Sequence, residues 1–199
     1  MRCAQCERRC IYSPMAIATE FHLDEATAVL SRTPAALDAL LRGLPDTWVS
    51  GNEGEGSWNA YDIVGHLANL ERTDWMARLR RILEEGESRP FDRVDRFAQM
   101  KEGQGQSLEQ RLDEFARLRR ENLSAMQALN LQPEDFARRG MHPALGPVTL
   151  ANLLATWALH DLTHLHQLSR VMAHQYSDTV GPWVKFLGVL KCDGHSAPA

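Results

Sequence analysis

Apolar side chains recur at helical spacing along most of the chain, and hardly any segment alternates apolar and polar residues as a half-buried strand does. The clearest case follows Ser107 and Gln110, which form a capping box, where one side of the predicted helix is apolar and the other is charged. Its apolar positions are Leu108, Leu112, Phe115, Leu118 and Leu123. The pattern therefore predicts an all-α protein.

Capping residues and helix breakers divide this pattern into four long helices. Thr33 and Pro34 interrupt the first, because proline is favoured in the first turn after a capping threonine, so the helix either kinks there or a second one begins. Ser57 is the expected cap of the second helix, and Thr149 is that of the fourth. The predicted helices span residues 23–44, 58–85, 107–129 and 150–172, and a short amphipathic helix is expected near Pro182.

Two polar connectors, 86–106 and 133–147, link the predicted helices. Four long helices with two sizeable connectors predict a four-helix bundle. A chain of 199 residues has room for one domain with a full-sized core. We expect that domain to span residues 15–192, after a flexible cysteine-containing leader at 1–14 and before a tail at 193–199.

The charge balance gives no sign of a polyanionic partner. The formal net charge is -4, from 22 Lys and Arg against 26 Asp and Glu, which argues against binding to nucleic acid or to an anionic membrane surface. No apolar run approaches the ~20 residues that cross a bilayer, and the N-terminus lacks the apolar stretch of a secretory signal. We therefore expect a soluble cytoplasmic protein. Trp183 and Phe186 could cover a homodimer contact or cap the chain's own core.

Three of the four cysteines, Cys3, Cys6 and Cys10, crowd the N-terminus, and Cys192 lies near the other end. Cysteines spaced by two residues resemble half of a zinc or cluster site, since two thiolates at that spacing can reach one ion. Half a site does not hold a metal, so a reduced extension without a site is the simpler interpretation. A disulfide framework is not expected in a chain of this size that is 44% hydrophobic.

His160 and His164 stand four residues apart in the fourth predicted helix, so their side chains point in directions only ~40° apart and can hold one ion. The helix is apolar on almost every face, which suits a helix buried in a bundle, and a histidine there needs a partner. Thr156 and Gln167 fall in the same polar stripe, beside Trp157. The stripe predicts an interior polar pocket, with two hydrogen-bonded core histidines as the alternative to a metal site.

A metal ion needs more than two ligands, and a bundle can supply another from a facing helix. His66 is the candidate, since Gly65 and Ala68 beside it would let another helix approach. Asp62, one turn earlier, could orient the ring through its second nitrogen. The helical wheel places His66 at the border between an apolar arc and a polar strip, so spacing alone is compatible with a ligand and with a half-exposed histidine.

Two motifs resemble those of the DinB-like superfamily of small bacterial four-helix proteins, which includes YfiT-type proteins assigned as metal-dependent hydrolases. One is a second helix that begins at Trp58 and carries Gly-His-Leu-Ala at 65–68, and the other is His-Asp-x-x-His-Leu at 160–165. The resemblance covers roughly residues 23–190. It implies an up-up-down-down bundle and one divalent metal ion held by three histidines. These map onto His66, His160 and His164.

Three neutral imidazoles would leave a position open for water or a small-molecule substrate, as in catalytic zinc sites. Zinc and nickel suit nitrogen ligands best, and iron and manganese are also compatible. Thiol transferases within the superfamily imply a site that takes a low-molecular-weight thiol, which attacks an electrophile. The hydrolase branch implies attack by metal-bound hydroxide on an ester or amide. A stress-related protein whose ion only joins two helices is a third interpretation.

Asp161 is the candidate catalytic carboxylate, because it occupies the place of the Glu in His-Glu-x-x-His metalloproteases. Asp161 is one methylene shorter than that Glu and points ~100° away from His160. A structural role, or a role in supporting a metal ligand, therefore fits it better than the role of a general base. His166 points away from the histidine pair by roughly 200° and is expected at the surface. The expected wall of the thiol pocket consists of Thr156, Trp157 and Gln167.

Overall fold

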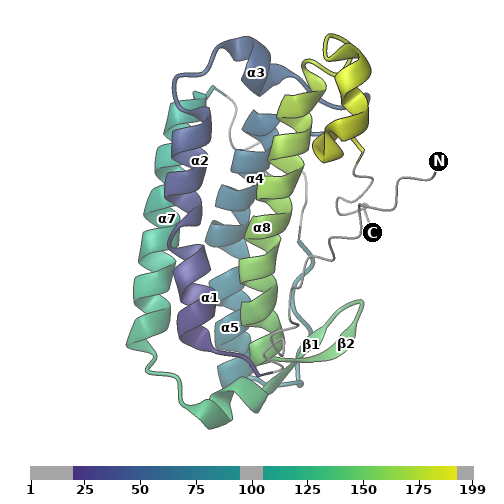
Figure 1. Cartoon of the computed structure of the whole chain (residues 1–199). Helices are drawn as coiled ribbons and strands as arrows, with labels where there is room; N and C mark the ends of the chain where they lie inside the picture. The colour runs from purple at the N-terminus through teal and green to yellow at the C-terminus, as the bar shows by residue number, and fades with distance from the viewer. Residues whose placement is uncertain (1–19, 95–104, 192–199) are drawn as a thin grey trace, which may run out of the picture.

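The computed structural model describes residues 20–94 and 105–191, so the four cysteines, the predicted leader and the predicted tail lie outside the described residues. In chain order the elements are α1 (Leu23–Leu30), α2 (Thr33–Leu41), α3 (Asp46–Ser50), α4 (Ala60–Thr73), α5 (Trp75–Glu84), α7 (Leu108–Ala128), the 3-10 helix η1 (Pro133–Ala137), strands β1 (Arg139–His142) and β2 (Gly146–Thr149), α8 (Leu150–His174), and the 3-10 helices η2 (Gly181–Phe186) and η3 (Gly188–Leu190). The predicted four-helix bundle is confirmed, with α1 and α2 together, α4 and α5 together, α7, and α8 as its four rods (Figure 1).

In chain order the four rods run up, down, down and up (Figure 1). The second and third rods are therefore parallel, whereas the expected up-up-down-down order would make the first and second rods parallel. The hydroxyl of Tyr61, at the start of α4, donates to the carbonyl of Gln106, just before α7, at 2.9 Å. Helices α4 and α7 therefore begin at the same end of the bundle. The chain must return the length of the bundle between α5 and α7, which explains the long connector that the sequence places there.

Complete capping boxes begin α4, α7 and α8. In each box the N-cap side chain accepts a hydrogen bond from the third helical N–H, and the third side chain accepts one from the N-cap N–H. The pairs are Asn59 with Asp62, Ser107 with Gln110, and Thr149 with Asn152. The predicted caps Ser107 and Thr149 are confirmed. Ser57 is not a cap: its hydroxyl donates to the carbonyl of Gly54 at 2.7 Å, within the preceding loop.

Two of the predicted long helices are each divided. The first ends at Leu30, and a new helix begins at Thr33 with Pro34 in its first turn. Of the two predicted alternatives, a kink or a second helix, the structure has the second helix. The second is interrupted at Asp74, whose φ of -117° and ψ of -67° depart from helical values. The hydroxyl of Thr73 donates back to the carbonyl of Asn69 at 2.9 Å, a contact that often accompanies a bend.

A two-stranded antiparallel hairpin, β1 and β2, occupies most of the segment 139–149 and replaces part of the connector predicted at 133–147. Its strands are four residues long and contain Gly and Pro, so they give little alternation for a sequence pattern to reveal. Gly140 allows the hairpin to pack on α5. A Cβ there would lie 2.7 Å from Cγ1 of Ile82 and 2.8 Å from the ring of Phe91.

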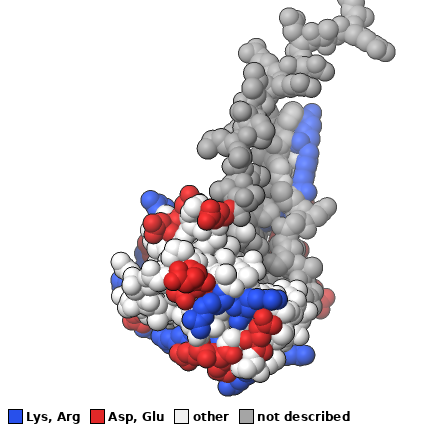
Figure 2. Space-filling model, turned by 90° about the horizontal axis from the view of Figure 1, so that it is seen from below, with Lys and Arg blue, Asp and Glu red and all other residues white. Residues whose placement is uncertain are grey.

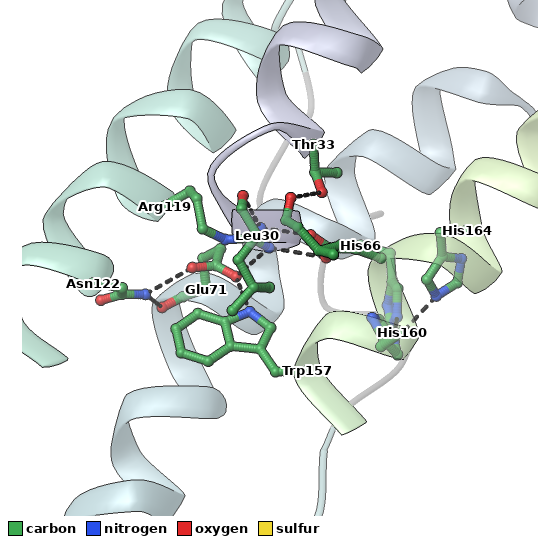
Figure 3. A network of polar contacts seen from close by, with 11 residues as sticks. Leu30, Thr33, His66, Glu71, Arg119, Asn122, Trp157, His160 and His164 are labelled. Carbon is green, nitrogen blue, oxygen red and sulfur yellow. Dashed lines mark hydrogen bonds and ion pairs between the residues drawn. The ribbon is translucent and has the colours of Figure 1, made fainter. Parts of the chain in front are cut away.

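A buried ion network joins all four rods (Figure 3). The guanidinium of Arg119 in α7 donates to both carboxylate oxygens of Asp161 in α8 at 2.5 and 2.9 Å, and to Glu71 of α4 at 2.8 Å. It also donates to the carbonyl of Leu30 in α1 at 2.8 Å. Glu71 in turn accepts from the indole N–H of Trp157 at 2.8 Å. Buried charges persist only when paired and hydrogen-bonded, so this network links the rods in one arrangement.

The outer surface shows no extended patch of one charge sign where Figure 2 displays described residues, because acidic and basic side chains are interspersed at this end of the bundle. Trp183 and Phe186 are 68% and 69% exposed, so they do not cap the chain's own core, and the homodimer stays a prediction. Among the described helices, none combines the length and the apolar character that a membrane span requires.

Candidate metal centre

The three predicted histidines meet in the middle of the bundle, His66 from α4 and His160 and His164 from α8 (Figure 3). The Nε2 atom of His160 lies 3.4 Å from that of His66 and 3.1 Å from that of His164. Nitrogen ligands ~2.1 Å from one ion are separated by about 3.0 to 3.4 Å in octahedral or tetrahedral geometry. All three ligand atoms lie within 4.8 Å of one another, so the cluster fits a metal site.

Gln167 fixes the proton of His164. Its side-chain oxygen lies 2.8 Å from Nδ1 of His164, one turn away on α8, and accepts the Nδ1 hydrogen. The lone pair is then on Nε2, the atom that faces His160. Burial lowers the pKa of His164 below its usual value, which keeps the ring neutral. A neutral imidazole with its Nε2 lone pair directed at the other rings is the form that binds a metal.

Two indoles enclose the imidazoles. The ring of Trp58 lies 4.7 Å from that of His66 and stacks on that of His164 at 6.3 Å, while Trp75 meets His160 edge-on at 5.3 Å. His66 is 6% exposed and His164 is 4% exposed. The half-exposed alternative for His66 is therefore excluded. These aromatic contacts limit the rotation of the rings.

The cluster forms part of the wall of a pocket of about 450 Å³, which is within the usual range of small-molecule sites. Thr156 and Gln167 line this pocket, as the sequence predicts. Trp157 does not: it is fully buried behind the wall, where it bonds to Glu71 and stacks on Trp75 at 5.7 Å. Its large ring lies on the core face of α8. The helical wheel places Trp157 beside the polar stripe, but it cannot show whether the ring faces the pocket or the core.

Asp161 lies outside the pocket lining. Its carboxylate is fully buried and receives both hydrogen bonds from Arg119, so it is not available as a general base for a group in the pocket. This position agrees with the structural role that the direction of Asp161 on the helix predicts. Asp62 does not orient His66, because its side chain accepts from the backbone N–H of Asn59 in the α4 capping box.

The sequence patterns did not single out three polar residues that line the far part of the pocket: Asp74, Arg78 and His142. Asp74, the residue just before α5, and Arg78, one turn later in α5, form an ion pair at 2.6 Å. His142 comes from the hairpin, whose existence the sequence does not reveal. An acidic and a basic residue four apart usually form a solvated pair on a helix surface, so only the packing of the hairpin, with β1 on α5 and β2 on α8, gives them a place in a pocket.

Burial raises the pKa of Asp74 from 3.8 to about 6, despite the nearby Arg78. The unfolded chain therefore releases this proton at lower pH than the folded chain, so ionisation of Asp74 opposes folding. We expect the free energy of unfolding of the wild type to fall relative to that of Asp74→Asn as pH rises from about 4 to about 6, by about 2 kcal/mol. Urea unfolding of both proteins with a metal chelator across this range measures the difference. A constant difference between the two proteins would contradict the expectation.

A sequence profile described as the DinB superfamily matches residues 30–168. No curated protein sequence matches the chain. Among solved structures, the chain is similar to YfiT from Bacillus subtilis, with a TM-score of 0.64 and 23% sequence identity over 81% of this chain and 94% of that one. YfiT is described as "a probable metal-dependent hydrolase with an unusual four-helix bundle topology". At this level of identity the likeness establishes a shared fold.

Proposed function

Because the chain belongs to the DinB superfamily, we propose that it is a metal-dependent enzyme in which three histidines hold one divalent ion. The observation that carries the proposal is the convergence of His66, His160 and His164 in the wall of a pocket large enough for a small molecule. Their nitrogen ligands suit zinc or nickel best, with iron and manganese as alternatives. A site with only three protein ligands keeps a position for a substrate, unlike a closed structural site.

A thiol is the substrate that the surrounding residues favour. A divalent ion would lower the pKa of a coordinated thiol or water. The pKa of a free thiol is about 8.5 and that of water is much higher, so water depends more on a nearby base. Among the described residues, Asp74 is the only carboxylate in the pocket lining, and it is paired with Arg78. We therefore propose a low-molecular-weight-thiol S-transferase. Such thiols are kept reduced in the cytoplasm, the expected compartment.

The residues around the histidines have separate tasks in this proposal. Gln167 holds His164 in the tautomer that binds a metal. Trp58 and Trp75 limit water beside the reacting sulfur, so that the sulfur meets the electrophile rather than solvent. Thr156 lines the wall along which the thiol would lie. Asp161 acts only through Arg119, in the framework that holds α8 in place.

Hydrolysis of an ester or amide is the second candidate. It is favoured by the likeness to YfiT and by Asp74, whose raised pKa of about 6 suits a carboxyl that accepts a proton near neutral pH. For this role Oδ2 of Asp74 would accept the proton, because Arg78 contacts Oδ1.

We expect the metal-loaded protein to conjugate a bacterial thiol with monochlorobimane. The assay uses bacillithiol, mycothiol and glutathione in turn, and follows the fluorescent product. His164→Ala should reduce the rate to background, because it removes a ligand. His166→Ala is the matched control, since His166 is exposed on the same helix two residues away, and it should keep the wild-type rate.

Three results would argue against the transferase. Equal rates in the wild type and His164→Ala would exclude the three-histidine site as the catalyst. Cleavage of esters or amides that depends on Asp74, without thiol conjugation, would support the hydrolase. Inactivity in both assays, with metal removal only lowering the melting temperature, would support a metal ion that merely joins α4 and α8.

A further inference from the structure

The pocket extends well beyond the three histidines. From the cluster it continues along α5, where Asp74 and Arg78 line it, to the hairpin, where His142 lines it. Between these polar ends the wall is apolar and includes Leu70 and Leu153. Arg78 is twelve positions after His66 on the nearly continuous rods α4 and α5, which corresponds to at most about 18 Å of helix. The shape suits an elongated molecule with one end at the histidines.

Arg78 presents hydrogen-bond donors to the far end of the pocket. Its Nε faces Oδ1 of Asp74 at 2.6 Å, and its guanidinium lies over the ring of Phe91 at 5.3 Å, so both contacts limit where the group can move. The two Nη atoms carry four further N–H bonds. Within the described residues, the structure shows no acceptor on either Nη atom. With 14% of its side chain exposed, Arg78 can offer a planar fork of donors to a ligand.

His142 adds a donor of fixed orientation. Its Nδ1 accepts hydrogen bonds from the backbone N–H groups of Ala144 and Leu145, both at 3.1 Å. The ring proton is therefore on Nε2, which can only donate. Burial, together with the charge of Arg78, lowers the pKa of His142, so the ring stays neutral and keeps this tautomer. The far end thus combines a guanidinium fork with a second N–H donor.

We infer that the far end of the pocket binds a carboxylate of the thiol substrate through Arg78 and His142, while the sulfur lies at the histidine cluster. This inference rests on the proposed function. A group made only of acceptors is what a set of donors recognises. Asp74 already balances the charge of Arg78, so a carboxylate with one negative charge fits this end better than a phosphate with two.

The test uses ω-mercapto carboxylic acids of increasing chain length, namely mercaptohexanoic, mercaptooctanoic and mercaptoundecanoic acid, and the amide of each. Their binding to the metal-loaded protein is followed by the fluorescence of Trp58 and Trp75, which line the pocket. We expect the acid of the best length to bind about tenfold more tightly than its amide, since hydrogen bonds to charged groups are the stronger ones. Arg78→Gln should remove this preference and leave the affinity for the amide unchanged. Arg80→Gln, an exposed arginine on the same helix outside the pocket lining, should leave the preference intact.

Asp74→Asn provides a second variant that keeps the guanidinium. Without the competing carboxylate it should bind the acid several-fold more tightly than the wild type does. Equal affinity of acid and amide at every length, or a preference that persists in Arg78→Gln, would overturn the carboxylate site while leaving the metal proposal in place. Tighter binding of a phosphonate of the same length would also overturn it. No binding of any of these thiols to the metal-loaded protein would overturn the thiol function itself, and this inference with it.

Discussion

Replacement of His66, His160 and His164 together by alanine is expected to abolish stoichiometric binding of a divalent metal ion. The wild type should hold about one ion per chain, because the three Nε2 atoms are already spaced as the ligands of a single ion. The triple variant retains no imidazole in the cluster, so its metal content after dialysis should be at background. Elemental analysis of both purified proteins measures this, and circular dichroism shows that the variant is folded.

Graded variants make the same expectation more specific. Gln167→Ala keeps all three rings but removes the acceptor that fixes His164, and should weaken metal binding by about 10- to 100-fold. His166→Ala should bind the ion as the wild type does, since His166 is exposed. A folded triple variant with the wild-type metal content would show that the ion is bound elsewhere.

Arg119→Met is expected to destabilise the protein by about 3–5 kcal/mol, because it leaves two buried carboxylates without their cation. Arg119 is 1% exposed and contacts every rod of the bundle through Leu30, Glu71 and Asp161. The loss also removes the donor to the carbonyl of Leu30, which would stay buried. Urea unfolding at constant pH, monitored by circular dichroism, gives the free energy difference.

Two further variants separate the lost charge from the lost packing. Arg117→Met on the same helix breaks an exposed pair with Glu121 and should change stability by less than about 1 kcal/mol. Adding Glu71→Gln and Asp161→Asn to Arg119→Met should recover part of the loss, since amides in place of the carboxylates leave no unpaired buried charge. A single Arg119→Met variant as stable as the Arg117→Met control would show that the network contributes little to folding.

Helical periodicity and capping chemistry predict most of the bundle because both are local properties of the chain. The boxes at Ser107 and Thr149, and the double start at Thr33, follow from residues within one turn of each other. The break at Asp74 has no such signal, since neither proline nor glycine marks it. The hairpin also could not be predicted from the sequence. Its strands are too short to show an alternating pattern, and they are held in place by packing on α5.

The histidine site could be predicted only in part. The spacing of His160 and His164 places two rings on one face of a helix, but the position of His66 depends on how α4 meets α8, which its own wheel leaves open. The far end of the pocket depends on β1 and β2 and could not be predicted without them. Family resemblance pointed to the third candidate ligand, His66, where spacing did not.

The sequence contains a signal for the buried network. Arg119 follows Phe115 by four residues and Leu112 by seven, and Glu71 follows Leu67 by four, so both charges stand on apolar faces. A charge in such a place must either bend out to solvent or find a buried partner of opposite sign. The pattern predicts that partners exist, but not which residues they are, because the partners lie on other helices.

The network also has an electrical consequence for the histidine cluster. Glu71 and Asp161 are two carboxylates around one guanidinium, so in ionised form the group carries one surplus negative charge in the core. The negative charge of Asp161 acts on His164, where it favours the positively charged form of the imidazole. In an interior that screens charge weakly, a cation held by the three imidazoles would act as the counterion of this surplus. The residues that join the four rods would then also help the protein to retain its metal.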